Sequence, residues 1–572
     1  MKSTLEQLIG SAVDELQPDG DTSTPEIVVE RTRDPAHGHF SCNVAMRMAK
    51  ALKKAPRDIA DDVLAALPVN DLIESTDVAG PGFINFRLQP AAFHAELEAM
   101  LDRAENYGHS DIGANRKVLL EFVSANPTGP LHVGHGRHAA YGACVANLLS
   151  ATGHDVHREY YVNDAGRQMD ILALSVWLRH LQANDHAFDF PGSAYQGEYI
   201  REIAVTYKGS TELPPGLFDD LPDDSDAELD LLIERARSAL GEDGFEQVLQ
   251  IALDAILGDI RQDLAEFGVE FEEWFSEKSL TGSGAVQKAL DLLAENKVTY
   301  EQDGAIWFRA TDYNDEKDRV VVRDNGRTTY FASDIAYHLE KRERGFEQLI
   351  DIWGADHHGY IPRVRAGMEA MGQPSDCLHV ELVQFVALYR GGEKAQMSTR
   401  SGEFITLRQL REEVGNDAAR LFFVMRSNEQ HLDFDLDLAK SSSNENPVYY
   451  LQYAHARVCS VMRQLEEKGF KWDATNARAN LKQLSESHEE SLMLALTKFS
   501  ETVEAAALQR APQHIVHYLK ELAQEFHAYY NAHKFIVDDA GLRDARLMLV
   551  LATRQVMRNG LALLGVNAPE QM

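Results

Sequence analysis

One stretch, residues 124–153, constrains the fold of this 572-residue chain more than any other. The preceding residues, RKVLLEFV, form a short apolar run that predicts a buried strand. The proline- and glycine-containing residues 127–130 predict a loop, and from Leu131 the apolar spacing predicts a helix that ends at Gly153. The next apolar run, HDVHREYYV, predicts a second strand. This strand–loop–helix–strand order is typical of a parallel nucleotide-binding sheet.

Two histidines stand at the start of the predicted helix. His132 and His135 are three residues apart, so they share one face of the first helical turn. Gly134 between them leaves room for a flat ligand to approach closely. A helix N-terminus also attracts phosphate through its free N–H groups and its dipole. The pattern therefore predicts a triphosphate site, although a bare H-x-G-H also occurs as two surface histidines on an ordinary helix.

The composition indicates a multidomain globular protein. Hydrophobic residues make up 44% and charged residues 26% of the chain. The first residues contain no apolar segment suited to a signal peptide, and no run approaches the length of a membrane-spanning helix. Cys42, Cys144, Cys377 and Cys459 lie far apart without a C-x-x-C pair. This spacing disfavours a disulfide framework or a zinc ribbon, and we expect a cytoplasmic protein.

The net charge of -34 alone disfavours a nucleic-acid partner, because phosphates prefer basic surfaces. The charge is unevenly distributed, however. Residues 181–250 contain 4 Lys+Arg and 16 Asp+Glu, whereas residues 441–572 contain 14 and 15. The acidic excess is therefore concentrated away from the C-terminal region, and its simplest role is solubility.

The order of predicted elements indicates a multidomain α/β protein. Residues 1–110 predict a separate α+β module. Residues 111–390 predict a doubly wound, Rossmann-like parallel sheet, and the acidic stretch at about 181–250 is predicted to be an insertion between its halves. Residues 391–440 contain a glycine-rich polar loop and connecting helices. Residues 441–572 predict an all-α bundle, because each helical segment carries an apolar stripe.

Several polar residues stand where a ligand could bind to this sheet. Glu121 lies in an apolar strand, where a carboxylate is costly unless it is paired. His357 lies in the loop GADHHG, after the predicted strand LIDIW, and open α/β sheets bind ligands at such carboxyl ends. Asp334 follows Tyr330 by one helical turn; the alternative role for Asp334 is a helix N-cap.

The stretch ANPTGPLHVGH resembles the first signature of class I aminoacyl-tRNA synthetases, and in detail that of the arginyl-tRNA synthetases. HGHFSCN and GPGFINF resemble the N-terminal domain of that family, which contacts the tRNA elbow, and the C-terminal helices resemble its anticodon-binding domain. The resemblance implies activation of L-arginine by ATP to arginyl-adenylate, followed by transfer to the 3′-terminal adenosine of tRNA(Arg). It implies ATP with Mg²⁺ as a substrate complex, no permanent cofactor, no protein metal ligands, no membrane and a monomer.

The same resemblance implies roles for individual residues. His132 and His135 contact the triphosphate as its negative charge develops. A guanidinium substrate requires planar, bidentate carboxylates, and the implied arginine pocket consists of Glu121, Asn126, Tyr330, Asp334 and His357, with Asn126 on the amino-acid backbone. The implied ATP-binding residues are Pro127, Thr128, Gly129, His132, Gly134, His135, Met397 and Ser398.

The second signature of the family, KMSKS, is altered in this chain. The aligned residues are Gln396, Met397, Ser398, Thr399 and Arg400, so both lysines are missing. Developing phosphate charge still needs cations in a site shielded from water. Arg400 is therefore predicted to be catalytic, with Lys394 as the second candidate.

Three other functions remain open from the sequence. A class I synthetase for another amino acid is disfavoured by the two pocket acids and by the absence of metal-ligand cysteines. A metal-dependent hydrolase would use His132, His135, Asp356, His357 and His358, but the glycine-flanked context suits a rigid metal site poorly. A non-catalytic RNA-binding protein would not need the intact HVGH, and a test for ATP turnover separates it from an enzyme.

Overall fold

The computed structural model describes residues 1–16, 25–395 and 405–572. The described chain forms two compact units. The first combines Met1–Tyr107 with Arg457–Lys498 and Gln524–Val556, and the second combines Gly108–Ala456 with Phe499–Ala523 and Met557–Met572. The first signature segment of the sequence belongs to the second unit.

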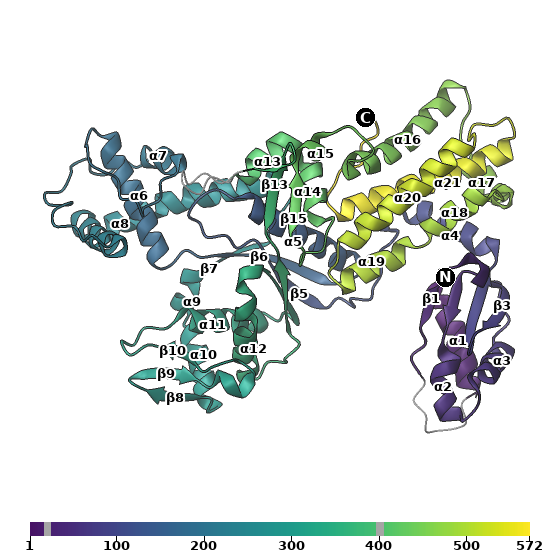
Figure 1. Ribbon diagram of the computed structural model, residues 1–572, viewed down its shortest axis with the longest axis horizontal. Helices are drawn as coiled ribbons and strands as arrows, with labels where there is room; N and C mark the ends of the chain where they lie inside the picture. The colour runs from purple at the N-terminus through teal and green to yellow at the C-terminus, as the bar shows by residue number, and fades with distance from the viewer. Residues whose placement is uncertain (17–24, 396–404) are drawn as a thin grey trace. The chain divides into compact units, whose positions relative to one another are not determined.

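A five-stranded parallel sheet forms the centre of the second unit (Figure 1). The strand order is β12-β11-β5-β6-β7. The chain therefore adds β6 and β7 on one side of β5, and later adds β11 and β12 on its other side. This reversal is the topological switch point at which open α/β sheets bind ligands. The predicted doubly wound fold is confirmed. The strands are β5 (Lys117–Glu121), β6 (Asp155–Val162), β7 (Glu273–Ser276), β11 (Gln348–Gly354) and β12 (Leu378–Val383).

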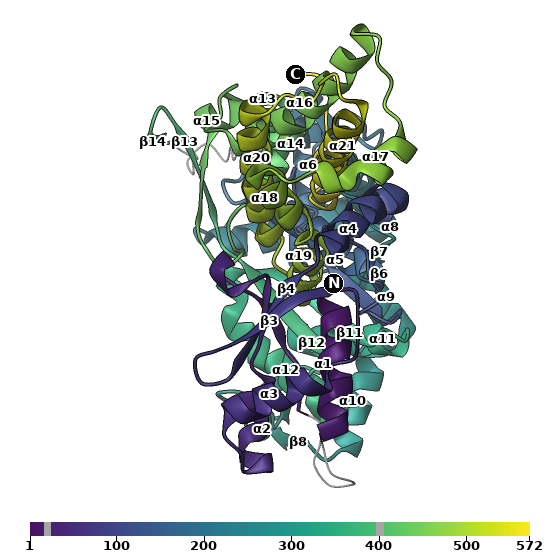
Figure 2. The same cartoon turned by 90° about the vertical axis from the view of Figure 1, so that its right-hand side faces the viewer.

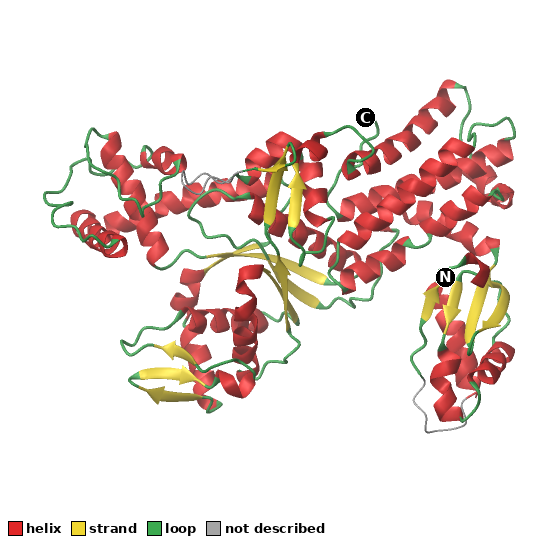
Figure 3. Ribbon diagram, viewed as in Figure 1, coloured by secondary structure: helices red, strands yellow, loops and turns green. Residues whose placement is uncertain are grey.

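Helices cover both faces of this sheet, as expected for parallel strands (Figure 3). On one face, three helices pack around Leu119 and Leu349. On the other, the helix after β5 comes so close that a Cβ on Gly142 would lie 2.3 Å from the Phe122 ring. These helices are α10 (Ala285–Glu295), α11 (Tyr330–Glu343) and α12 (Ile361–Ala370) on the first face and α5 (Val133–Ala151) on the second.

The acidic stretch interrupts the sheet before β7. The helices that contain it lie together (Figure 1) and come between β6 and β7 in the order of the chain, so the predicted position between the two halves is wrong. The reason is that β7 has only four residues, too few for a periodic signal. These helices are α6 (Arg167–Ala183), α7 (Glu198–Ala204) and α8 (Ser225–Glu266). A second insertion follows β7 and consists of α9 (Glu277–Ser283), β8 (Thr299–Gln302), β9 (Ala305–Phe308) and β10 (Arg319–Val322).

The segment LHVELVQFVAL, predicted as one strand, forms two. β12 joins the central sheet, whereas β13 (Val386–Arg390) pairs with β14 (Glu393–Lys394) and β15 (Leu432–Asp435) in a separate sheet. Gln384 lies between the two strands, where its N–H donates to the carbonyl of Asn428 instead of to a ladder. The helices beside this small sheet are α13 (Leu407–Val414), α14 (Asn416–Val424) and α15 (Leu436–Lys440).

The N-terminal module is an antiparallel sheet covered by helices (Figure 2). Its strand order is β1-β2-β4-β3, with β1 (Val29–Arg31), β2 (Phe40–Cys42), β3 (Ile73–Ala79) and β4 (Phe83–Leu88). Its helices are α1 (Lys2–Leu16), α2 (Val44–Leu52), α3 (Pro56–Ala66) and α4 (Pro90–Arg103).

The C-terminal segment is all-helical, as predicted. Its helices are α16 (Pro447–Glu467), α17 (Ala474–Asn480), α18 (Ser487–Leu496), α19 (Phe499–Leu508), α20 (Gln513–Ala532) and α21 (Ala540–Leu563). Among the described residues, no helix combines the length and the apolar composition that crossing a membrane requires.

Candidate active site

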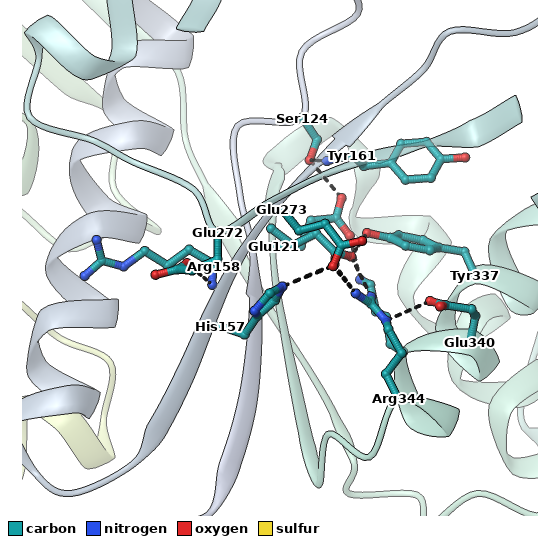
Figure 4. Close-up of polar contacts among 12 residues, drawn as sticks. Glu121, Ser124, His157, Arg158, Tyr161, Glu272, Glu273, Tyr337, Glu340 and Arg344 are labelled. Atoms are coloured by element: carbon teal, nitrogen blue, oxygen red, sulfur yellow. Dashed lines mark hydrogen bonds and ion pairs between the residues drawn. The ribbon is translucent and has the colours of Figure 1, made fainter. Parts of the chain in front are cut away.

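The loop after β5 begins with two residues in a strained backbone conformation. Val123 has φ +70° and Ser124 has φ +40°, and a β-branched residue rarely adopts a positive φ. Hydrogen bonds hold this turn. The Ser124 hydroxyl donates to Glu121 Oε1 at 2.9 Å and accepts from the Tyr161 N–H at 3.1 Å (Figure 4). A strained backbone that is held by the surrounding structure is typical of functional sites. Here the strained turn leads the signature loop away from the end of β5.

His132 and His135 form the N-terminal cap of α5. The helix begins at Val133, two residues later than the predicted start at Leu131, because His132 is the N-cap. The two rings stack with centroids 3.6 Å apart, as predicted for side chains that share one face. His132 Nδ1 accepts from the N–H of Gly134 at 3.0 Å, and His135 Nδ1 accepts from the N–H of His132 at 3.3 Å.

These hydrogen bonds determine which groups at the N-terminus of α5 remain able to bind phosphate. The N–H groups of Gly134 and His135 donate to His132 Nδ1, and the N–H of Val133 donates to the carbonyl of Ile405. The prediction of free N–H groups is therefore wrong, because the histidine cap and the Ile405 carbonyl accept their hydrogen bonds. Since each Nδ1 is an acceptor, the proton of each neutral ring lies on Nε2. Burial lowers the pKa of both His132 and His135, so both are neutral N–H donors near pH 7.

Three carboxyl groups surround Tyr161 at the carboxyl ends of the strands. Asp164 follows β6, Glu277 follows β7, and Asp334 lies in the second turn of α11. Asp164 accepts from the Ser276 hydroxyl at 2.6 Å. Burial and the nearby charges of Asp334 and Asp164 raise the pKa of Glu277 to about 7. Burial, these three acids and Glu121 also raise the pKa of Tyr161. The site therefore concentrates negative charge at the edge where a ligand binds.

Part of this negative charge has no partner within the described chain. Glu277 Oε2 is buried and accepts no hydrogen bond from any described residue. The Tyr360 hydroxyl donates to Asp334, whose pKa burial raises. The alternative of Asp334 as a helix N-cap is wrong, because Thr329 caps α11. A buried acceptor without a donor is costly, so the pocket is suited to a cation that carries several N–H groups.

Glu121 is a buried carboxylate whose pairing partner was not predicted from the sequence. Lys341, with a fully buried side chain, donates to Glu121 Oε2 at 2.6 Å and to Asp351 Oδ1 at 2.9 Å. His338 contacts Asp351 through Nε2 at 2.7 Å. Because Lys341, His338 and Asp334 share α11, these bonds fix that helix against β5 and β11. Glu121 thus lies inside the wall of the pocket, with both of its oxygens bonded.

The other predicted arginine-pocket residues, Asn126, Tyr330 and His357, are exposed to solvent. Asn126 is exposed, and its Oδ1 accepts from the Asn163 side chain at 3.3 Å. Tyr330 is 65% exposed, and its hydroxyl would lie 3.4 Å from a Cβ on Gly166, in the loop after β6. His357 is exposed in the 3-10 turn after β11.

The predicted ATP-binding loop packs against the insertion. The Tyr199 hydroxyl of α7 donates to the carbonyl of Thr128 at 2.5 Å, and a Cβ on Gly129 would lie 2.9 Å from that hydroxyl. Pro127 is buried. Lys394 is exposed on β14. The predicted residues Met397, Ser398 and Arg400 lie outside the described residues.

The metal-dependent hydrolase hypothesis finds no support in the described ranges. There, the one group of three side chains that could hold a metal is His157, Glu159 and Glu273, with ligand atoms within 4.8 Å of one another. Arg344 already bonds Glu159 at 2.6 Å and Glu273 at 2.7 Å (Figure 4). These carboxylates are therefore neutralised by a guanidinium. None of the five residues of that hypothesis belongs to this group.

Comparisons with known proteins match the chain along its whole length. Family models match residues 3–88 (arginyl tRNA synthetase N terminal domain), 96–442 (tRNA synthetases class I (R), catalytic domain) and 451–572 (DALR anticodon binding domain). Arginine–tRNA ligases of Thioalkalivibrio sulfidiphilus and Halorhodospira halophila are 57% and 53% identical, with all of both chains covered. The chain belongs to the arginyl-tRNA synthetase family. The arginyl-tRNA synthetase structure from Thermus thermophilus, 24% identical with full coverage of both chains and a TM-score of 0.76, shares the fold.

Sequence analysis missed several residues of this arginyl-tRNA synthetase site. Tyr161, Asp164, Glu277 and Tyr360 belong to the pocket by contact or by charge. The sequence could have indicated two of them. Asp164 and Glu277 each follow a strand, and ligands bind at the carboxyl ends of the strands in open α/β sheets. The third histidine of the helix, His138, was also missed; burial and the charges of His132 and Arg137 lower its pKa to about 4.

Arginine binding is expected to strengthen as pH rises through about 7. Glu277, with its pKa raised to about 7, is mostly protonated at pH 6 and ionised at pH 8. Arginine keeps its positive charge, so ionisation adds an attractive partner. A tenfold lower Kd at pH 8 than at pH 6 follows, to order of magnitude, if only the ionised form binds. Calorimetric titration of arginine should show this dependence, and Glu277→Gln should abolish it. A flat profile for the unaltered protein would exclude Glu277 from the pocket.

Proposed function

We propose that this site joins L-arginine to ATP, giving arginyl-adenylate and pyrophosphate, and then transfers the arginyl group to the 3′-terminal adenosine of tRNA(Arg). The observation that carries the choice of amino acid is the group Asp164, Glu277 and Asp334, with the buried Glu277 oxygen that no described residue bonds. A planar guanidinium supplies five N–H donors and a permanent charge to such acceptors. The full-length similarity to arginine–tRNA ligases supports the same activity.

ATP is proposed to bind against the cap of α5. The Nε2–H groups of His132 and His135 donate to phosphate oxygens, and the helix dipole adds attraction. Gly134 and Gly129 let the His132 ring and the Tyr199 hydroxyl pack directly against the backbone, at positions where a Cβ would clash. Pro127 and Thr128 complete this side. Met397 and Ser398 are proposed to bind ATP as well, by the resemblance to the family. Mg²⁺ arrives with ATP, held mainly by phosphate and water.

Arginine is proposed to lie with its guanidinium on Asp334 and Glu277. Asn126 holds the α-amino and carboxylate groups, so that a carboxylate oxygen attacks the α-phosphorus as pyrophosphate leaves. Tyr330 and His357 close the mouth. Glu121 contributes from inside the wall: through Ser124 it stabilises the strained turn, and through Lys341 it fixes α11. Positioning of this kind is a main source of rate in phosphoryl and acyl transfer.

The flanking segments are proposed to bind tRNA. Residues 1–110 contact its elbow, residues 111–390 form the catalytic domain, residues 391–440 carry the second signature, and residues 441–572 bind the anticodon. The near-neutral charge of the last segment removes the repulsion that the chain's overall acidity would cause. We propose a cytoplasmic monomer.

Arg400→Ala is expected to lower kcat about 100-fold with little change in the KM for arginine, because the lost cation acts on charge that develops in the transition state. Lys394→Ala should cost less. Rapid-quench measurement of adenylate formation in a single turnover separates this step from product release. Rates equal to the unaltered protein in both variants would assign the charge to another basic residue.

Charging of tRNA tests the proposed function directly. Purified protein, ATP with Mg²⁺ and a tRNA(Arg) transcript should incorporate labelled arginine, and none of the other amino acids. A tRNA transcript for a different amino acid is the matched control. Incorporation of another amino acid would overturn the proposal.

A further inference from the structure

Two carboxylates face each other across the last pair of strands in the central sheet. The register of β6 and β7 places Glu159 opposite Glu273. Neighbouring strands lie about 4.8 Å apart, so two negative side chains at paired positions on one face repel each other. Glu159 is completely buried, which makes this repulsion stronger than it would be in water. β7 has four residues and lies at the edge of the sheet, so it has little backbone pairing to oppose the repulsion.

Arg344, the C-cap residue of α11, neutralises both carboxylates (Figure 4). Its Nη1 donates to Glu159 Oε2 at 2.6 Å and to Glu273 Oε2 at 2.7 Å, and its Nη2 donates to Glu159 Oε1 at 3.0 Å. The Tyr337 hydroxyl of the same helix also donates to Glu159. The guanidinium carbon of Arg344 lies 5.5 Å from the centre of the Phe275 ring, which belongs to β7. A planar group with five N–H donors can bond two carboxylates at once.

The other basic side chains at this place do not make the same contacts as Arg344. His157 Nε2 lies 3.4 Å from Glu273 Oε2 and 3.8 Å from Glu159 Oε2 (Figure 4), but it forms no hydrogen bond with any described residue. The ammonium group of Lys341 already bonds two carboxylates on β5 and β11. The guanidinium of Arg344 is therefore the group that links β6, β7 and α11 by hydrogen bonds.

The three elements that Arg344 links are the ones that carry the acids of the arginine pocket. Asp164 follows β6, Glu277 follows β7, and Asp334 belongs to α11. The two strand ends are also linked to each other, because the Ser276 hydroxyl donates to Asp164 Oδ2 at 2.6 Å. A shift of β7 relative to β6 and α11 would therefore change the spacing of the three acids.

We propose that Arg344 is a positioning residue for the recognition of arginine. By bonding Glu159 and Glu273 it holds β7 against β6 and α11, and so sets the spacing of the acids that receive the guanidinium of the substrate. Glu277 lies four residues beyond Glu273, about 13 Å along an extended chain, so Arg344 acts through the strand and not by contact with the substrate. The inference rests on the proposed function, which assigns the three acids to the substrate.

Replacement of Arg344 tests this role through the KM for arginine. Arg344→Ala should raise this KM by about 10- to 100-fold, because misplacing a binding group by about 1 Å can cost a factor of this size. The KM for ATP should stay within about twofold of its original value. A purely structural role would lower the amount of folded enzyme, which changes the apparent kcat but neither KM.

The matched control lies two residues earlier on the same helix. Arg342 donates to the carbonyls of Phe346 and Glu347 and to the side chain of Gln373, and not to β6 or β7. Arg342→Ala therefore also removes a guanidinium with several hydrogen bonds, but it leaves the paired carboxylates neutralised. It should leave the KM for arginine unchanged.

A second substitution separates the charge effect from a loss of packing. In the Arg344→Ala background, Glu273→Gln removes the repulsion that the missing guanidinium exposes, and it should lower the KM for arginine by about threefold or more. In the unaltered protein, Glu273→Gln removes an attraction to Arg344 and should raise the same KM, by up to about fivefold. Opposite signs in the two backgrounds are the signature of a carboxylate pair that Arg344 neutralises.

Three results would overturn the inference: an unchanged KM for arginine in Arg344→Ala, an equal rise in the KM for ATP, or a Glu273→Gln effect of the same sign in both backgrounds. If Arg344→Ala does not fold, Arg344→Lys carries the same comparison, because an ammonium group is a point charge that lacks the planar fork. Failure of the unaltered protein to charge tRNA(Arg) with arginine would instead refute the proposed function.

Discussion

Asp334→Asn is expected to raise the KM for arginine about 30-fold or more. The substitution keeps the size of the side chain and an oxygen for the Tyr360 hydroxyl. It removes the negative charge that is proposed to pair with the guanidinium of arginine. Truncating one side of a desolvated charge pair costs about 2–5 kcal/mol, and 1.4 kcal/mol corresponds to a factor of ten. Steady-state kinetics with saturating ATP and tRNA measure the effect.

The control for this variant lies on the same helix. Glu343 of α11 pairs with Lys288 at 2.6 Å on the exposed side. An exposed pair of this kind is worth about 0–1 kcal/mol, so Glu343→Gln should leave the KM for arginine unchanged. If Asp334→Asn also leaves it unchanged, Asp334 serves only to anchor Tyr360, and the guanidinium binds elsewhere.

His135→Ala is expected to lower kcat about 100- to 1000-fold, with little change in the KM for arginine. In the proposed site the lost Nε2–H is a preorganised donor to phosphate, and removal of one such donor has effects of this size. His135→Ala also removes the acceptor for the His132 N–H, so His132 loses part of its orientation. Single-turnover adenylate formation reports the chemical step.

A histidine at the other end of α5 provides the comparison. His154 lies just past the C-terminus of the helix, where Nδ1 contacts the Leu149 carbonyl at 3.1 Å. His154→Ala should change the melting temperature but not the rate of adenylate formation. A loss of rate in His135→Ala that is matched by His154→Ala would point to helix stability rather than phosphate contact as the cause.

The sequence predicted the part of the site that is local in the chain. The strand before the loop, the helix after it and the shared face of His132 and His135 all follow from residues within one 40-residue stretch, where periodicity and turn chemistry decide the structure. The capping hydrogen bonds were not predicted, because a histidine N-cap is unusual and its Nδ1 geometry depends on side-chain rotamers. This is why the helix N–H groups were wrongly predicted to be free.

Contacts between distant segments escaped the sequence analysis. Glu277 reaches the pocket from the end of β7, a four-residue strand that periodicity does not reveal. The partner of Glu121 is Lys341, 220 positions away, and only the register of β5 against β11 brings α11 over it. The hydrogen bond from Tyr199 of the acidic insertion to the Thr128 carbonyl was also not predicted, because the charge run gave no sign of a contact with the signature loop.

Amino-acid-dependent exchange between ATP and labelled pyrophosphate tests the central claim most directly, because it reports which amino acid the carboxylate pocket admits to adenylate formation. The assay is run with each of the amino acids in turn, with and without tRNA(Arg). The account predicts exchange with arginine alone, and only when tRNA(Arg) is present, with lysine excluded because it cannot satisfy the bidentate acceptors. Exchange supported by any other amino acid would contradict it.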